Sequence, residues 1–322
     1  MKLPMVQRMV WLTAATALLT ALGIAPAGAD GTAGTADGRQ DAATGWQKVG
    51  GDARSGVSGI AYEGHAPHGA GVSALVVHDN KDTGQQRLSR ITLGKDSDRV
   101  SPVTWDGPEP VDLEAVEAVP GQPSEYLALA GRGIVYHLEV TGSTAKVLDY
   151  APLPAIGQGD NFESLALVSR DNHLAALWAD RGAGRDRPAT LYSASLSFDE
   201  WGQAQFGGVT HQAYRAAYPT DQETRHISDI SVTDSGRIVV SSAADEGDDG
   251  PFESAVSEAG RVTVSGAGQV RVTLAASPTV LKTFPQHKIE GVECLPGTTE
   301  ALLGTDDENL GGYVRTLPLC RN

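Results

Sequence analysis

The stretch Ile289-Glu290-Gly291-Val292 has four similar counterparts earlier in the chain: Val57-Ser58-Gly59-Ile60, Leu113-Glu114-Ala115-Val116, Phe162-Glu163-Ser164-Leu165 and Ile227-Ser228-Asp229-Ile230. In each of them an apolar residue is followed by Ser or Glu, then by a small residue or Asp, and then by an aliphatic residue. The polar members lie 56, 49, 65 and 62 residues apart. A repeat of about 50 to 60 residues is typical of β-propeller blades with long loops. The repeat therefore predicts an all-β, five-bladed β-propeller.

Short aliphatic or alternating runs fill each repeat, and 38 Gly and 17 Pro interrupt the chain. This pattern indicates three or four strands per repeat and no long helix. The last repeat runs out of chain after Leu317, one strand short. We expect residues 46–49 to supply the missing strand and close the ring, which leaves no open sheet edge. A β-sandwich is the alternative, and it does not account for the long repeat.

The N-terminus has the pattern of a secretory signal peptide over residues 1–29. Lys2 and Arg8 precede an apolar run, and Ala27-Gly28-Ala29 offers a cleavage site of small residues, with a second cut two residues earlier as the alternative. A membrane anchor is disfavoured because the run is shorter than about 20 residues. We therefore expect a secreted, extracellular protein without membrane insertion. It would have a flexible leader over residues 30–45 and a propeller domain over residues 46–322.

The charge of the chain excludes some partners. The full sequence has 25 Lys+Arg against 40 Asp+Glu, a net charge of −15. Without Lys2 and Arg8 the net charge is −17. A surface with this much negative charge repels nucleic acid and anionic lipid, and we therefore expect neither as a partner. We expect a monomer that recognises a small molecule or a cell-envelope component.

Cys294 and Cys320 are the two cysteines of the chain. In an exported protein a disulfide between them is the default expectation. Such a bridge would secure the same seam as the N-terminal strand. Two cysteines alone cannot form a structural zinc site.

The polar residue of each repeat is expected near one mouth of the central channel, because the first strand of each blade lines it. Three carboxylates and two hydroxyls would then converge, from Ser58, Glu114, Glu163, Ser228 and Glu290. Clustered carboxylates either rise in pKa or bind a cation. A set of oxygen ligands suits calcium before zinc. The alternative is a ring of solvated carboxylates without a metal.

The order Ser58, Glu114, Glu163, Ser228 and Glu290 on successive blades resembles the calcium-activated nucleotidases, the soluble apyrase family. The segment from His78 to Gly84 is similar to that family's acidic turn ending in Arg-Thr-Gly. The Glu163-Ser164 and Glu290-Gly291 pairs are similar to its third and last blade starts, and related esterase-like phytase propellers share the latter. The resemblance implies a five-bladed propeller with calcium in its tunnel, held by Ser and Glu.

Two basic motifs of that family are changed in this chain. Gly131-Arg132-Gly133-Ile134 replaces its Gly-Lys-Glu-Trp, and Ala179-Asp180-Arg181 only partly resembles its Pro-Arg-Arg. Those basic residues would contact nucleotide phosphates. Their replacement favours a calcium tunnel without nucleotidase activity.

Acidic and basic residues at strand ends form a second group of candidates. On the functional interpretation Asp79, Asp180 and Asp306 face the channel as catalytic bases, and Lys81 and Arg181 bind a phosphate or carboxylate of the substrate. On the structural interpretation they are turn residues, a role in which Asp is common.

Two functions follow from these patterns. The first is a secreted, calcium-binding propeller that acts as a ligand-binding or scaffold module. The alternative is a metal-dependent hydrolase of phosphate esters or anhydrides. Retained family features favour the enzyme, whereas the changed basic motifs favour the binder.

Overall fold

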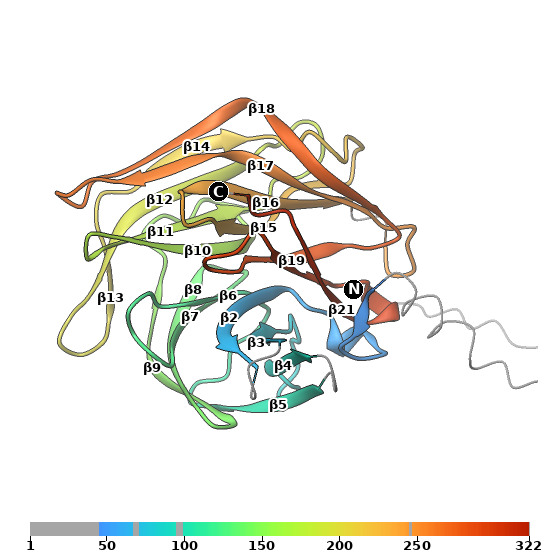
Figure 1. Ribbon diagram of the computed structural model, residues 1–322, viewed down its shortest axis with the longest axis horizontal. Coiled ribbons are helices and arrows are strands. Elements are labelled where there is room, and N and C mark those ends of the chain that lie inside the picture. Colours follow the sequence, from blue (N-terminus) through green and yellow to red (C-terminus); the bar gives the residue numbers. More distant parts are fainter. Residues whose placement is uncertain (1–44, 67–70, 95–98, 245–246, 322) are drawn as a thin grey trace, which may run out of the picture. The chain divides into compact units, whose positions relative to one another are not determined.

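Alternating and aliphatic runs form nearly all of the secondary structure, as antiparallel strands joined by turns (Figure 1). The computed structural model describes residues 45–66, 71–94, 99–244 and 247–321. The predicted signal peptide, and the predicted leader except Gly45, lie outside these residues. Two short 3-10 turns are the helical elements of the described ranges, η1 (Ala53–Ser55) and η2 (Glu308–Leu310). The all-β class is confirmed.

The first two repeats form one eight-stranded sheet. Each is a four-stranded antiparallel meander, and the outer strands β5 and β9 pair in parallel. The strands are β2 (Gly59–His65), β3 (Gly71–Val77), β4 (Leu88–Gly94), β5 (Arg99–Asp106), β6 (Leu113–Ala118), β7 (Glu125–Ala130), β8 (Ile134–Thr141) and β9 (Thr144–Pro152).

The third and fourth repeats form separate sheets. The third has the order β10-β11-β12-β13 with β14 also paired to β12, and the fourth has the order β15-β16-β17-β18. The β10–β11 hairpin turns at Asp171 and Asn172, which have φ of 50° and 63°. Positive φ at both central residues is the geometry of a tight type I′ turn. The strands are β10 (Phe162–Arg170), β11 (His173–Asp180), β12 (Ala189–Phe198), β13 (Ala204–Phe206), β14 (Thr210–Tyr214), β15 (Thr224–Val232), β16 (Arg237–Ala244), β17 (Glu253–Val264) and β18 (Val270–Pro285).

The last sheet combines both ends of the described chain. Its order is β19 (Ile289–Cys294), β20 (Ala301–Thr305), β21 (Tyr313–Leu317) and then β1 (Gln47–Lys48). The pairing of β1 with β21 confirms that an N-terminal strand completes the final unit. Trp46 is buried beside it, and its ring lies 6.1 Å from that of Phe284. The predicted disulfide joins Cys294 on β19 to Cys320 after β21.

The first strands of the five units form a closed ring. β2 contacts β6, β6 contacts β10, β10 contacts β15, β15 contacts β19, and β19 contacts β2. In Figure 1 these strands lie around the centre, while β5, β9, β13 and β18 lie further out. Four-stranded sheets around a central channel are the arrangement of a β-propeller.

The core is divided into five clusters, one between each pair of neighbouring units. Strand β3 shows how the sequence produces this. Leu75 and Val77 pack toward the second unit, whereas Ala74 and Val76 pack toward the last one. Successive side chains of a strand point to opposite faces, so a sheet buried on both faces needs a continuous aliphatic run. The described residues contain no helix long and apolar enough to cross a membrane.

We expect that replacing both Cys294 and Cys320 by Ser lowers the free energy of unfolding by about 3 kcal/mol, because the bridge closes a long loop in the unfolded chain. Urea unfolding of the double variant and of the wild type, each at neutral pH, measures this difference. The reduced wild type is the matched control and should resemble the variant. A loss below about 1 kcal/mol would contradict a stabilising role for the bridge.

Candidate functional site

Three glutamates stand at the same structural position in three first strands. Glu114, Glu163 and Glu290 each occupy a register shift at the start of their strand, where the pairing with the second strand skips one residue. Such a bulge re-aims a side chain. Glu114, Glu163 and Glu290 are each at least nine-tenths buried. The sequence repeat therefore corresponds to a structural repeat, and it directs the three carboxylates to one end of the ring.

Arg225 joins two of these glutamates. Its Nη1 lies 2.6 Å from Glu290 Oε1 and 3.4 Å from Glu163 Oε1. Arg181 Nη1 also lies 2.7 Å from Glu163 Oε1. Burial raises the pKa of Glu163, while the positive charges of Arg225 and Arg181 act against this rise. A guanidinium from the fourth unit thus bridges carboxylates of the third and fifth units.

Lys288 brings a further positive charge to Glu290. Its Nζ lies 3.3 Å from Glu290 Oε1 and also pairs with Glu308. Burial acts to lower the pKa of Lys288, but the negative charges of Glu290, Asp306 and Glu308 outweigh this, so the pKa is raised. Lys288 therefore stays protonated although its side chain is 1% exposed. The pKa of Asp306 is raised well above its usual range, first by burial and then by Glu290.

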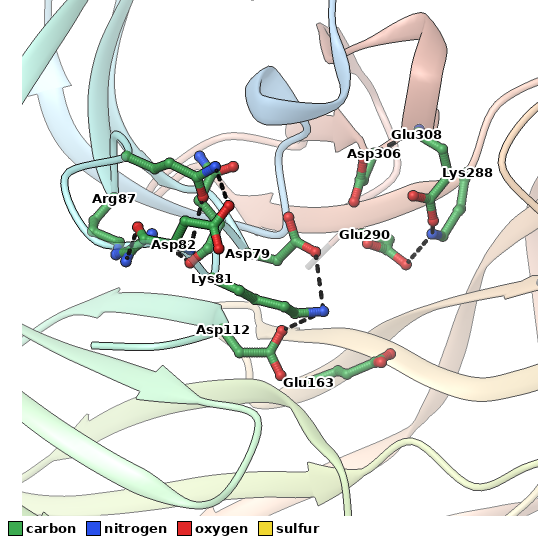
Figure 2. A network of polar contacts seen from close by, with 12 residues as sticks. Asp79, Lys81, Asp82, Arg87, Asp112, Glu163, Lys288, Glu290, Asp306 and Glu308 are labelled. Atoms are coloured by element: carbon green, nitrogen blue, oxygen red, sulfur yellow. Dashed lines mark hydrogen bonds and ion pairs between the residues drawn. The ribbon is translucent and has the colours of Figure 1, made fainter. Parts of the chain in front are cut away.

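Asp79, Lys81 and Asp112 form the most accessible side of the site. Figure 2 shows Lys81 reaching between Asp79 and Asp112, with Glu290 and Asp306 around the same space. Lys81 Nζ lies 3.1 Å from Asp112 Oδ1 and 4.0 Å from Asp79 Oδ2. Burial and the charge of Glu290 raise the pKa of Asp79 to about 6. A carboxyl group in this range can exchange its proton near neutral pH.

Glu114 faces the other acids of the site. Burial raises its pKa well above the usual range, and the charges of Glu163, Asp112, Glu290 and Asp79 raise it further. Arg225 contacts both Glu163 and Glu290, and the charges of these two glutamates act on the pKa of Glu114. Glu114 is thereby favoured as a neutral acid, while Arg225 and Lys288 balance charge at Glu290.

Three buried oxygens of the predicted calcium ligands have no hydrogen-bond partner in the described structure: Ser58 Oγ, Ser228 Oγ and Glu163 Oε2. Buried polar atoms are normally satisfied by protein, water or an ion. No group of three or more His, Cys, Asp or Glu side chains within the described ranges is arranged to hold a metal. The calcium site stays a prediction.

Asp180 has other partners. Its Oδ2 lies 2.8 Å from Arg187 Nη1, and its Oδ1 accepts a hydrogen bond from the Asn161 backbone N–H at 2.9 Å. Gly182 N–H donates to Oδ2. These contacts support the loop that follows β11. The arrangement thus matches the turn-residue interpretation at Asp180, whereas Asp79 and Asp306 join the central cluster.

The sequence analysis did not identify Arg225, Lys288, Asp112 or Glu308 as members of the site. A signal was present for two of them. The residue two places before the repeated Ser or Glu is polar in four of the five repeats: Asp112, Asn161, His226 and Lys288. This polar position in the aligned repeats therefore points to Asp112 and Lys288. Arg225 has no counterpart in the other repeats, so only the folded arrangement reveals its role.

The opposite end of the channel holds two further buried glutamates. Glu117 and Glu293 come three residues after Glu114 and Glu290, and they line a cavity of about 470 Å³ with Ser231. Glu293 accepts hydrogen bonds from Tyr62 N–H at 3.3 Å and Ser231 Oγ at 3.1 Å. Burial raises the pKa of Glu293 to about 7. The channel is therefore acidic at both ends, but Arg225 and Lys288 contact only the first end.

Comparison with known proteins finds likeness at the level of structure alone. No protein-family model and no curated protein matches the sequence. A GH43 β-1,3-galactosidase solved with galactodeoxynojirimycin has 8% identity and a TM-score of 0.45, and the match covers 82% of this chain and 90% of that chain.

Two longer GH43 proteins are similar to a comparable degree. The Bacteroides ovatus Xyloglucan PUL GH43B protein has 13% identity and a TM-score of 0.44, over 83% of this chain and 56% of that one. A GH43 protein of Bacillus licheniformis has 12% identity and a TM-score of 0.40, over 68% of this chain and 44% of that one. The chain thus spans about half the length of these two proteins. The likeness extends no further than the fold, and it does not confirm the resemblance to calcium-activated nucleotidases.

We expect Asp79→Asn to stabilise the protein at pH 7.5 and to have little effect at pH 4. The pKa of Asp79 is about 6 in the fold against an ordinary value of 3.8, so the folded state binds the proton more tightly. Stability from this proton is therefore lost as pH rises from about 4 to about 6. Asn removes the cost of the charge, by about 1–2 kcal/mol after solvent screening.

Urea unfolding at the two pH values measures this effect, with Asp106→Asn as the exposed control. The control should show no such pH-dependent gain. A variant of Asp79 that is less stable than the wild type at pH 7.5 would contradict the raised pKa.

Proposed function

We propose that this chain is an exported, monomeric, five-bladed β-propeller that binds a small polar ligand at the central site, with calcium as part of that site. The five units are counted as blades because each contributes one first strand to the ring. The ligand is a small molecule or a cell-envelope component. The single observation that carries the proposal is the set of buried oxygens without partners at Ser58, Ser228 and Glu163.

The side chains around these oxygens suit a polar ligand. Lys81 is 63% exposed and Arg181 is 27% exposed, so both can donate hydrogen bonds to it. Asp79 is 32% exposed and can accept them. A ligand that carries hydroxyl groups or an anionic group would find both donors and acceptors here.

Calcium fits the oxygens of this site in part. Ser58, Glu114, Glu163, Ser228 and Glu290 would hold it, since calcium prefers six to eight oxygen ligands. Calcium would supply positive charge toward the ligand when bound. Arg225 already supplies positive charge to Glu163 and Glu290. Calcium would therefore compete with this arginine for the two carboxylates.

We expect millimolar calcium, added after EDTA treatment, to raise the Tm of the protein by several degrees, because a ligand of the folded state stabilises it. Magnesium should not substitute for it. The Glu114→Gln, Glu290→Gln double variant should lose the calcium effect, and Asp106→Asn should retain it. Thermal unfolding measures all four cases. An identical rise in the double variant, or none in the wild type, would overturn the calcium site.

Hydrolysis of phosphate esters or anhydrides is the second candidate function. The observation that favours it is the pKa of about 6 for Asp79, beside Asp306, whose pKa is raised well above its usual range. Acids with separated pKa values can take the roles of base and acid. Asp79 would activate water, Asp306 would protonate the leaving group, and Lys81 with Arg181 would neutralise the substrate phosphate.

We expect, on this second proposal, that the protein releases phosphate from nucleoside triphosphates or nitrophenyl phosphate. Asp79→Asn should lower the rate by about 100-fold or more, the usual contribution of a general base. Asp106→Asn is the control and should keep the wild-type rate. A phosphate-release assay that finds no turnover by the wild type on either substrate would exclude this activity and leave ligand binding.

A further inference from the structure

A cavity of about 330 Å³ lies beside the central site, between the loop that follows β11 and the segment that precedes β15. Its lining includes two arginines, Arg185 and Arg215, together with Asp221 and His226. Neither arginine belongs to the central cluster. Both are exposed, so a molecule in solution can reach them.

Main-chain carbonyls position the two guanidinium groups. Arg185 Nε donates a hydrogen bond to the Thr220 carbonyl at 3.0 Å, and Arg215 Nη1 donates one to the Arg185 carbonyl. A guanidinium has five N–H donors, so each arginine keeps several for a ligand. No carboxylate in the part of the chain that the structure describes forms an ion pair with Arg185 or Arg215, whereas the neighbouring Arg187 pairs with Asp180.

The loop that carries Arg185 is attached to the wall of the cavity. Gly184 N–H donates to the Thr224 carbonyl at 2.8 Å, and Ala183 N–H donates to the Arg187 carbonyl at 2.8 Å. His226 Nε2 lies 2.8 Å from the Gly184 carbonyl. Arg185 therefore extends from a loop whose backbone is held on both sides, whereas Arg215 lies on the segment between β14 and β15.

His226, Asp221 and Thr224, which also line the cavity, form hydrogen bonds within the protein. Ala216 N–H donates to His226 Nδ1 at 3.2 Å, so the ring proton is on Nε2, facing the Gly184 carbonyl. Burial lowers the pKa of His226, which keeps the ring neutral. Asp221 Oδ1 accepts from Glu223 N–H at 2.9 Å and from Thr224 Oγ1 at 3.0 Å. The positive charge that the cavity offers to a ligand is therefore that of the two guanidinium groups.

We propose that this cavity binds a small anion, either free or as the anionic group of a larger molecule: a carboxylate, a phosphate or a sulfate. Planar guanidinium groups match the oxygens of these anions with paired hydrogen bonds. Arg185 and Arg215, which form no ion pair with a carboxylate in the described structure, make this cavity locally positive although the net charge of the chain is −15. They concentrate anions that the rest of the surface repels. The site is distinct from the central cluster and does not depend on the function proposed for it.

The test uses sodium phosphate, sodium sulfate and sodium acetate at constant ionic strength, with sodium chloride as the reference salt. Isothermal titration calorimetry should show saturable binding of at least one of the three anions to the wild type. The Arg185→Gln, Arg215→Gln double variant should lose this binding. Arg99→Gln removes an exposed arginine from β5, in another sheet, and should bind as the wild type does.

Two further measurements keep the test decisive. The Tm of each variant in sodium chloride shows whether it is folded. Arg185→Lys keeps the charge but loses the paired geometry, so its affinity should fall by about tenfold. The anion that binds identifies the ligand class, and methyl phosphate in place of phosphate shows whether a substituted anion also fits. Equal binding by the double variant, or no saturable binding of any anion to the wild type, overturns the proposal.

Discussion

The close approach of five strands around one channel is the constraint on which the rest of this structure depends. A Cβ atom added to Gly59 would lie 2.7 Å from the Ala115 Cα, which shows how near the backbones of β2 and β6 come. Such spacing requires small residues next to the repeated Ser or Glu. It also places those polar residues at a common level, where bulges direct three glutamates toward one end.

Burying carboxylates this close together has an electrostatic cost, and the two ends of the channel meet it differently. At the first end Arg225, Arg181 and Lys288 supply positive charge to Glu163 and Glu290. At the other end main-chain N–H groups and a hydroxyl satisfy the carboxylates, and their pKa values are raised. Charge compensation thus gives the first end both positive and negative side chains, while the second end favours protonated acids.

The position of the central site at the ends of several strands explains why aspartates and glutamates from different strands meet there. Ends of second strands and starts of first strands alternate around the same mouth, so Asp306 lies near Glu290 of its own sheet and Asp79 near Glu290 of another sheet. The loop after β11 and the segment before β15 extend outward from this mouth, and the Arg185 and Arg215 cavity lies between them. The acidic centre and the basic cavity are therefore built by adjoining segments of the chain.

The sequence alone determined the all-β class, the five repeats, the N-terminal strand that completes the last sheet, and the disulfide. Each depends on a local pattern: the period of the repeat, a missing strand, or two cysteines in a chain with a predicted signal peptide. The sequence repeat also singled out Glu114, Glu163 and Glu290, and the structure has a register shift at each of these three residues.

Only the tertiary structure decided which charges meet. Arg225 reaches Glu163 and Glu290 across sheets whose residues are more than 60 positions away in the chain. Asp180 instead binds Arg187 within its own loop. No periodic pattern encodes these choices, because an ion pair depends on the separation of side chains in space, and this separation is set by closure of the ring.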